Sequence, residues 1–292
     1  MTDSTQPIVL AIDGGGTRCR IAVETDAGVT SVEAGSANVS TDFDGGVHQI
    51  IEGLSTLSAA AGLALSAIKD APAFIGLAGV TGPEIAGRLS STLPLNHTRI
   101  ADDQPAALRG ALGARDGVIA HCGTGSFYGA QIAGSMTFAG GWGPTLGDEA
   151  SAQWIGRAAL RVTLETVDGR VDASALSARL MERFGGATGI VRFGGSAQPA
   201  EFGALAPLVT SHAADGDSLA VQIMTEGARE IGRSLPQIGW RPGLVICLTG
   251  GIGPHFEPYL PEEMRDAIVA PAGEPLSGAL SLARDFAEGI DS

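Results

Sequence analysis

A glycine-rich turn between two apolar segments constrains the fold of this chain most strongly. Residues 8–12 are apolar and predict a buried strand, and residues 21–25 predict a second strand soon after it. Between them lie Asp13, three consecutive glycines and the hydroxyl of Thr17. Glycine permits the positive φ of a tight turn and lets backbone N–H groups approach a ligand. The pattern predicts a hairpin whose turn is either an ordinary connection or an anion-binding loop, with the Asp13 carboxylate suited to hydrated Mg²⁺.

Composition limits the class of ligand. The chain has 292 residues, of which 44% are hydrophobic, so it can form one large core or two smaller ones. Its net charge of −14 argues against a surface that binds nucleic acid or an anionic membrane. An anionic ligand would therefore need a local site lined by N–H groups.

The cysteines and the N-terminal residues give no sign of secretion. Cys19, Cys122 and Cys247 are far apart and form no CxxC pair, so neither a zinc site nor a disulfide framework is indicated. The first residues lack the basic and apolar regions of a signal peptide, and no apolar run reaches about 18 residues. We expect a cytoplasmic protein.

The first part of the chain alternates strand and helix patterns. Such an order, with turns at the strand ends, predicts an α/β domain with a mixed sheet. The predicted elements are strands 8–12, 21–25 and 29–32, helix 47–63, strand 73–78, helix 83–93, strand 98–101 and helix 106–112.

A second α/β pattern begins near residue 115, where we place the domain boundary. Strands at 117–121 and 126–130 flank a second glycine turn, Gly123-Thr124-Gly125. The hairpin architecture therefore repeats, although its sequence does not. The later elements are helices 173–184, 201–213, 218–235 and 278–287, a strand at 244–248, and an unplaced glycine-rich segment at 185–200.

Two pairs of acidic residues follow strand or loop segments. Asp102 and Asp103 stand between a strand and a helix, where a carboxylate acts either as a general base or as a helix N-cap. Asp148 and Glu149 are predicted to open a long helix, where they either recognise a hydroxyl or complement the helix dipole.

Other candidate residues have plain structural alternatives. Trp142 packs either in the core or against a sugar face, and we favour the core. The five histidines have no metal-binding spacing, and we interpret His121 as structural. The turn Thr249-Gly250-Gly251-Ile252-Gly253 follows a strand, where it either joins strand to helix or lets a flat ligand such as adenine lie near the backbone.

Taken together, these motifs resemble a known superfamily. Residues 13–18, Asp103 with the segment 106–111, residues 123–126 and residues 249–253 occur in the order found in sugar kinases, actin and heat-shock chaperones. Residues 140–152 with Trp154-Ile155 resemble N-acetylglucosamine kinases and the BadF/BadG/BcrA/BcrD ATPases. The resemblance covers nearly the whole chain.

The resemblance implies an α/β fold of two actin-like (ribonuclease H-like) lobes with an ATP cleft between them. It implies an N-terminal lobe at 1–115, a C-terminal lobe at 116–277, and a final helix at about 278–290 that packs back on the first lobe. ATP and Mg²⁺ are the implied cofactors, and a homodimer is the implied assembly.

The resemblance also assigns roles to residues. Asp103 would be the catalytic base that activates the sugar 6-hydroxyl, and Asp13 would face hydrated Mg²⁺. Nucleotide binding falls to Gly14, Gly15, Gly16, Thr17, Arg18, Gly123, Thr124, Gly125, Gly250 and Gly251. Substrate binding falls to Asn38, Asp103, Trp142, Gly143, Asp148 and Ala152.

Some residues depart from the family pattern. Phe127 stands where asparagine often follows the second glycine turn, and Ala150 replaces a glycine. The zinc-binding cysteines of ROK sugar kinases are absent, as are the paired iron–sulfur cysteines of the radical-enzyme activators. The departures at Phe127 and Ala150 affect the expected substrate more than the expected reaction, and the absent cysteines exclude those two branches of the superfamily.

The sequence therefore predicts an ATP-dependent kinase of an amino sugar, most directly N-acetylglucosamine, which yields the 6-phosphate. The alternatives are a glucosamine kinase and a BadF-type ATPase that couples ATP hydrolysis to a partner protein. A sugar sensor without catalysis fits less well, because Asp103, Asp13 and all the glycine turns are present.

Overall fold

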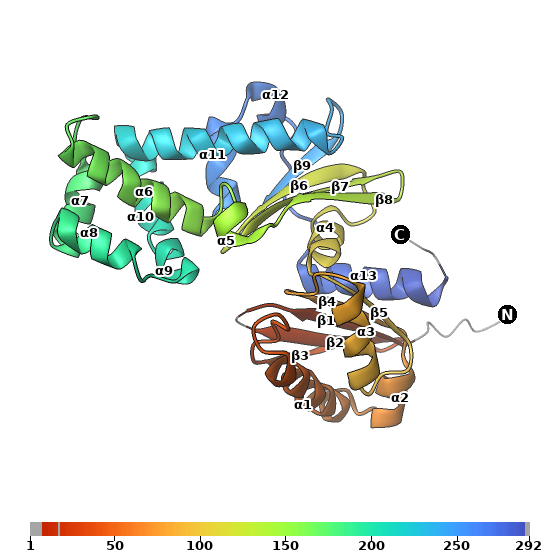
Figure 1. Cartoon of the computed structure of the whole chain (residues 1–292). Helices are drawn as coiled ribbons and strands as arrows, with labels where there is room; N and C mark the ends of the chain where they lie inside the picture. Colours follow the sequence, from red (N-terminus) through yellow and green to blue (C-terminus); the bar gives the residue numbers. More distant parts are fainter. Residues whose placement is uncertain (1–7, 17, 290–292) are drawn as a thin grey trace. The chain divides into compact units, whose positions relative to one another are not determined.

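The computed structural model describes residues 8–16 and 18–289. Contacts divide the chain into two compact units. Unit 1 comprises Met1–Arg115, Gln131–Met136 and Pro271–Ser292, and unit 2 comprises Asp116–Ala130 and Thr137–Ala270. Each unit contains its own sheet, so the mixed α/β class with two sheets is confirmed (Figure 1).

Unit 1 is built on a five-stranded mixed sheet in the order β3-β2-β1-β4-β5. The first three strands run antiparallel, and β4 and β5 run parallel to β1. The parallel strands β1, β4 and β5 bring their carboxyl ends to one edge of the sheet. The strands are β1 (Val9–Gly14), β2 (Cys19–Thr25), β3 (Gly28–Ala34), β4 (Ala73–Leu77) and β5 (Thr98–Ala101).

Helices cover both faces of this sheet, because alternate residues of the strands point to opposite sides. Leu10 and Ile12 of β1 belong to one core cluster, which includes buried residues of α1. Val9 and Ala11 belong to a second cluster, which includes buried residues of α13. The helices are α1 (Phe43–Ala61), α2 (Leu65–Asp70), α3 (Pro83–Thr92), α4 (Gln104–Leu112) and α13 (Pro275–Ala287).

The last helix, α13, crosses α4 at two glycines. A Cβ on Gly278 would lie only 2.9 Å from the Cα of Gly110, and one on Gly110 would lie 2.8 Å from the carbonyl carbon of Glu274. The two backbones therefore approach more closely than any side chain would allow. Since α4 follows Asp103 directly, the C-terminal helix supports the element that carries the predicted base.

Unit 2 repeats this plan with four strands in the order β8-β7-β6-β9, in which β9 runs parallel to β6. The strands are β6 (Gly117–Cys122), β7 (Ser126–Ile132), β8 (Ser135–Gly140) and β9 (Val245–Thr249). The helices are α5 (Gly143–Leu146), α6 (Ala152–Val167), α7 (Ala175–Phe184), α8 (Ala187–Gly194), α9 (Pro199–Gly203), α10 (Ala206–Ala214), α11 (Ser218–Gln237), the 3₁₀ helix η1 (Gly253–Tyr259) and α12 (Glu262–Arg265) (Figure 1).

The structure corrects one predicted helix start and assigns two segments that the sequence left unplaced. Asp148 and Glu149 do not open a helix, because α6 begins at Ala152 and the Ser151 hydroxyl accepts a bond from the backbone N–H of Trp154 at 3.3 Å. The glycine-rich segment 185–200 contains the helix α8, whose flanking glycines lie outside it or at its end. Strand β8 follows a glycine-containing turn and had no predicted counterpart.

Two segments lie with unit 1 although the sequence places them in the second lobe. At the tip of the β7–β8 hairpin, the Gln131 side chain donates to the carbonyls of Gly113 and Arg115, both at 3.0 Å, and accepts from Arg109 at 2.9 Å. Residues 271–277 join unit 1 through the bond from Ala272 N–H to the Ala111 carbonyl, 2.8 Å.

Within the described ranges, no helix is both long and apolar enough to cross a membrane.

Candidate active site

The glycine turn of unit 1 joins β1 to β2 and is supported by two other segments. The N–H of Gly15 donates to the Arg18 carbonyl at 2.9 Å, which closes the turn. Ala37 donates to the Gly15 carbonyl at 3.1 Å, and Ala78 donates to the Gly14 carbonyl at 2.8 Å. These bonds fix the turn to the loop after β3 and to the end of β4. The predicted phosphate contact Thr17 lies outside the described residues.

The three glycines of this turn differ in the space available for a side chain. A Cβ on Gly14 would lie 3.1 Å from the Cβ of Ala37 and would also meet Leu77, so this position is closed by packing. A Cβ on Gly16 would meet nothing within 4 Å, and one on Gly15 would meet only the Arg18 carbonyl at 3.9 Å. Gly15 and Gly16 therefore leave open space in which a ligand can approach the backbone.

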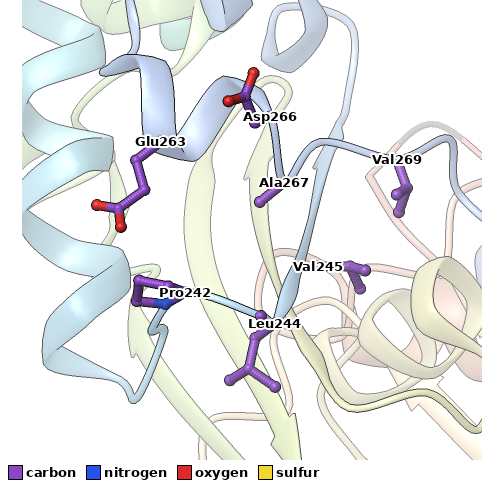
Figure 2. A pocket seen from close by; sticks show the side chains of 8 residues that line it. Pro242, Leu244, Val245, Glu263, Asp266, Ala267 and Val269 are labelled. Atoms are coloured by element: carbon purple, nitrogen blue, oxygen red, sulfur yellow. The ribbon is translucent and has the colours of Figure 1, made fainter.

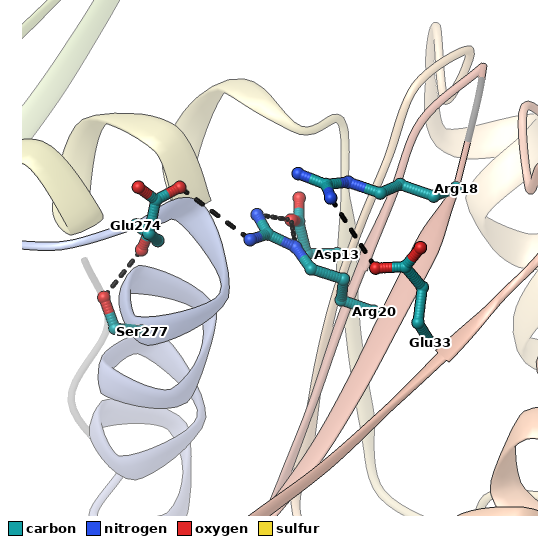
Figure 3. Close-up of polar contacts among 6 residues, drawn as sticks. All are labelled: Asp13, Arg18, Arg20, Glu33, Glu274 and Ser277. Carbon is teal, nitrogen blue, oxygen red and sulfur yellow. Dashed lines mark hydrogen bonds and ion pairs between the residues drawn. The ribbon is translucent and has the colours of Figure 1, made fainter.

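Asp13, at the end of β1, is held by an arginine from the neighbouring strand. Arg20 donates from Nη2 and Nε to the same oxygen, Asp13 Oδ2, at 2.7 and 3.2 Å. Its other terminal nitrogen lies 3.8 Å from the carboxylate of Glu274, at the start of α13 (Figure 3). Both members of the Asp13–Arg20 pair are mostly buried, with side chains 14% and 20% exposed. Nearby Arg18 is 57% exposed and reaches Glu33 at 3.6 Å.

The loop after β3 presents an asparagine beside this turn. The Oδ1 atom of Asn38 accepts bonds from the Ser40 N–H at 3.0 Å and from its hydroxyl at 2.8 Å. Gly79 packs against this loop with φ +93°, and a Cβ there would lie 2.8 Å from Asn38 Oδ1. Among the described residues, the Nδ2 group of Asn38 has no partner, so it can donate to a ligand.

The two carboxylates after β5 have separate roles. Asp102 Oδ1 accepts the Gln104 N–H at 3.1 Å and thus caps α4, whereas the Asp103 side chain makes no capping bond. Burial raises the pKa of Asp103 to about 6, and the charges of Asp102 and Asp13 add to this effect. Burial also raises the pKa of Asp102, although its bond to Gln104 opposes the shift. Asp103 is therefore a largely buried carboxylate that is not used to cap α4.

The glycine turn of unit 2 joins β6 to β7 in three residues. The N–H of Gly123 donates to the Gly125 carbonyl at 2.9 Å. Ala152, the first residue of α6, donates to the Gly123 carbonyl at 2.9 Å, and Ile252 donates to the Cys122 carbonyl at 2.9 Å. Thr124, at the centre of the turn, is exposed. The turn is thus fixed from both sides while its tip remains accessible.

Asp148 lies beneath this turn with only 6% of its surface exposed. Its Oδ2 accepts from Gln153 at 2.9 Å, and its Oδ1 accepts from the Ser126 N–H at 3.4 Å. The Ser126 hydroxyl donates to the Glu149 carbonyl at 2.6 Å. Asp148 therefore connects the turn to the segment that precedes α6.

That segment has unusual backbone conformations. Asp148 and Ala150 have φ values of +60° and +64°, a region in which residues with a Cβ are strained. The position of Ala150 thus explains why glycine is expected there. The alanine methyl is fully buried in this structure.

The third glycine turn follows β9. Gly250 has φ +78°, and a Cβ there would lie 2.5 Å from the carbonyl carbon of Cys122 and 2.8 Å from the N of Gly123. A Cβ on Gly251 would meet nothing within 4 Å. Gly250 therefore allows the turns after β6 and β9 to touch, and Gly251 leaves open space beside them.

Two aromatic residues of unit 2 have unexpected environments. Trp142 is 78% exposed, so its interpretation as a core side chain is wrong. Phe127 is buried and stacks on the His121 ring, with centroids 5.1 Å apart and planes inclined by 21°. Trp142 precedes Gly143, whose φ of +83° starts the short exposed helix α5.

A hollow of about 300 Å³ elsewhere in unit 2 is separate from these turns. It lies beside Val245 at the start of β9, with Glu263 and Asp266 at its rim (Figure 2). The glycine turn follows Thr249 at the other end of the strand, roughly 13 Å away at 3.3 Å per residue. This hollow therefore contributes nothing to the glycine-turn site.

Sequence reasoning did not identify Arg20, Gln153 or Glu274. Arg20 had a usable signal, because a hairpin with Gly14 opposite Cys19 places Arg20 directly opposite Asp13. Gln153 and Glu274 had none. Gln153 reaches Asp148 across a segment with positive φ at Asp148 and Ala150, and Glu274 reaches Arg20 from the distant start of α13.

Comparison with known proteins gives a consistent result. Residues 10–283 match the BadF/BadG/BcrA/BcrD ATPase family. The chain is 26% identical over 278 residues to a glucosamine kinase of Vibrio cholerae, covering 94% of this chain and 95% of that one. It is 27% identical over 273 residues to an N-acetylmuramic acid/N-acetylglucosamine kinase of Clostridium acetobutylicum, covering 88% and 89%.

A solved structure shares the fold. It is named "Putative N-acetylglucosamine Kinase" from Chromobacterium violaceum, and it is 33% identical with a TM-score of 0.80. The match covers 95% of this chain and 99% of that one. The expected fold class, α/β with two actin-like lobes, is therefore confirmed.

Proposed function

The protein belongs to the BadF/BadG/BcrA/BcrD ATPase family, and we propose that it is an ATP-dependent kinase that phosphorylates N-acetylglucosamine on its 6-hydroxyl. The family supports the use of ATP. Both curated relatives, from Vibrio cholerae and Clostridium acetobutylicum, are named as kinases of amino sugars. The choice of N-acetylglucosamine rests on the second relative and on the name of the solved structure.

The observation that carries the proposal is the state of Asp103. Asp102 caps α4, so the Asp103 carboxylate is free to accept a proton. A general base works best when its pKa lies near the working pH, and the pKa of Asp103, about 6, is close to neutral pH. In phosphoryl transfer such a carboxylate orients the attacking hydroxyl and accepts its proton. Asp103 is therefore the proposed base for the sugar hydroxyl.

The proposed nucleotide contacts lie on the glycine turns. Gly16, Gly125 and Gly251 offer backbone N–H groups, which bind phosphate well. The N–H groups of Gly15 and Gly123 close their own turns, so these two residues would leave room for the ligand. Gly14 and Gly250 serve by shaping these turns. Thr124 supports the proposal through its exposed hydroxyl, and Arg18 through its exposed guanidinium.

Asp13 fits the proposed role toward Mg²⁺. Arg20 occupies only Oδ2, and Oδ1 has no partner among the described residues. No group of three or more candidate ligands occurs in the described ranges. Mg²⁺ in kinases uses one or two carboxylates, waters and the phosphates, so one carboxylate is sufficient. When bound, the ion would neutralise charge on the phosphates.

Sugar recognition is proposed for the loops beside the two turns. Asn38 supports it with a free amide donor, and Trp142 with an exposed indole beside Gly143. Asp148 would act from beneath the turn, using lone pairs that its two existing bonds leave. Ala152 would contribute through its place next to Gly123.

Two alternatives have specific support. Glucosamine is the substrate named for the Vibrio cholerae relative. An ATPase coupled to a partner protein is the second alternative, since the family name specifies only an ATPase. Such a role through an iron–sulfur cluster needs accessible thiolates. Cys19, Cys122 and Cys247 are all buried, and burial raises the pKa of the first two to about 12.

The direct test measures ADP release with a panel of sugars: N-acetylglucosamine, glucosamine, N-acetylmuramic acid and glucose. We expect N-acetylglucosamine to raise turnover well above the rate with ATP alone, and mass spectrometry to show the 6-phosphate. A highest kcat/KM with glucosamine would replace the substrate assignment. Turnover that no sugar raises would reject the kinase proposal and favour the partner-coupled ATPase.

A further inference from the structure

A row of three side chains crosses the sheet of unit 2 just below the glycine turns. His121, on β6, lies opposite Thr249 in the parallel pairing with β9, and its Nδ1 is 3.1 Å from the Thr249 hydroxyl oxygen. On the other side, Phe127 of β7 stacks on the imidazole ring. The ring of His121 is therefore fixed both in its plane and in its rotation.

The other ring nitrogen, Nε2, faces the glycine turn. A Cβ placed on Gly123 would lie 3.2 Å from His121 Nε2, closer than to any other atom. No hydrogen-bond partner for this nitrogen occurs among the described residues. His121 as a whole is only partly exposed.

The imidazole is uncharged at neutral pH. Burial lowers the pKa of His121 to about 4. A neutral imidazole has one N–H donor and one acceptor. If the Thr249 hydroxyl donates to Nδ1, then Nε2 carries the hydrogen and points a donor at the turn. This tautomer suits an anion, because an Nε2 lone pair would repel one.

We propose that His121 is a nucleotide-binding residue, whose Nε2–H donates a hydrogen bond to a phosphate oxygen of ATP at the Gly123-Thr124-Gly125 turn. Thr249 sets the tautomer and Phe127 sets the ring plane. The inference rests on the proposed binding of ATP at this turn, but not on the identity of the sugar or on the phosphoryl transfer.

This assignment changes how two residues are interpreted. His121, interpreted as structural from the sequence, is assigned to ligand binding, and Phe127, which departs from the family pattern, supports the His121 ring. Phe127 and His121 then act as one unit, because an asparagine at position 127 could not stack on the ring. The pair supplies an oriented donor without adding charge to unit 2.

The first experiment compares two variants of His121 by calorimetric titration with ADP. His121→Leu keeps the bulk and removes the donor, and we expect Kd for ADP to rise about tenfold, the usual effect of one hydrogen bond to a charged acceptor. His121→Gln places an amide donor near Nε2 and should recover most of the affinity. His255→Leu, the same change at an exposed histidine of unit 2, should leave Kd unchanged.

The second experiment needs no variant and so remains valid if the substitutions impair folding. Imidazole ¹⁵N spectra of the wild-type protein should show a protonated Nε2 on His121, and its resonance should move when ADP is added. In the kinase assay, His121→Leu should raise KM for ATP and leave KM for the sugar unchanged.

The outcomes separate this inference from the proposed function. If wild-type protein binds ADP but the Nε2 resonance stays in place, or His121→Leu keeps wild-type affinity, the role of His121 is rejected alone. If the Nε2 atom is unprotonated, the donor assignment is rejected. If the wild-type protein binds no adenine nucleotide, the proposed function fails together with this inference.

Discussion

The first hairpins of the two units are built on one hydrogen-bonding plan. In unit 1, Ala78 from the segment after β4 donates to the carbonyl of Gly14, the last residue of β1. In unit 2, Ile252 from the segment after β9 donates to Cys122, the last residue of β6. The segments after β3 and β8 also correspond, since Ala37 donates to Gly15 and Ala152 donates to Gly123.

The side chains at matching positions differ in charge. One residue before the strand end, unit 1 has Asp13, paired with Arg20 on the next strand. Unit 2 has His121 at that position, stacked on Phe127 of the next strand. The first pair is ionic and the second is uncharged, since the pKa of His121 lies near 4. The same backbone thus carries a charged half-site in unit 1 and a neutral one in unit 2.

The two units therefore have different proposed roles. In unit 1 the charges of Asp13 and Asp102 raise the pKa of Asp103, the residue proposed for the base chemistry. Unit 2 supplies turns and uncharged donors. Proton transfer should therefore depend on unit 1, and nucleotide affinity should depend strongly on unit 2.

The largest expected effect is the loss of the base. Asp103→Asn should lower kcat by 10²–10⁴-fold, because the amide cannot accept the sugar proton. Asp102→Asn is the matched control: its amide oxygen can still accept the Gln104 N–H, so activity should fall by less than tenfold. Steady-state assays of both variants test this pair, and the assignment fails if the two variants lose activity equally.

Activity should also follow the protonation of Asp103. Since its pKa is about 6, kcat/KM should fall about tenfold per pH unit below that value. The folded-state pKa lies above the ordinary value of 3.8, so this group stabilises the fold below about pH 4, and the contribution is lost as the pH rises through 6.

The free energy of unfolding gives an independent test of the raised pKa of Asp103. At pH 7.5, Asp103→Asn should raise the free energy of unfolding by roughly 1–3 kcal/mol, because the variant no longer buries a charge. Urea titrations of wild type and variant at pH 4 and pH 7.5 should show the advantage only at the higher pH. An equal difference at both pH values would contradict the burial argument.

The contact between turns in unit 2 should be intolerant of a methyl group. Gly250→Ala combines a positive φ with a Cβ 2.5 Å from the Cys122 carbonyl carbon, so we expect a loss of stability of about 3 kcal/mol or more. Gly251→Ala has open space and should cost under about 1 kcal/mol. Thermal unfolding distinguishes them, and Gly251→Ala should raise KM for ATP if a nucleotide lies there.

The smallest expected effects are the stability losses on substituting two arginines of unit 1. Arg20→Gln leaves the mostly buried Asp13 without its cation and should cost roughly 1–3 kcal/mol in stability. Arg18→Gln removes an exposed contact with Glu33 and should change stability by under about 0.5 kcal/mol. Urea denaturation compares the two, and equal losses would show that Arg20 has no special role.

Much of the local structure was predictable from the sequence. The strands around both glycine turns follow from short apolar runs between glycines, and α1 follows from helical spacing of its apolar residues. The start of α6 was misplaced, because Asp148 and Ser151 are both acceptable caps and only the positive φ of Asp148 and Ala150 excludes the earlier start. Local preference cannot distinguish such alternatives when tertiary contacts hold a strained backbone.

The sequence by itself determined the repeated strand–turn–strand plan and the candidate residues on it, because both depend on neighbours in the chain. Only the tertiary structure decided which aspartate caps α4, that Glu274 at the start of α13 lies beside the Arg20 guanidinium, and that Thr249 contacts the His121 ring. The last two contacts join residues 254 and 128 positions apart, and pairing at that range is fixed by packing and not by neighbours in the chain.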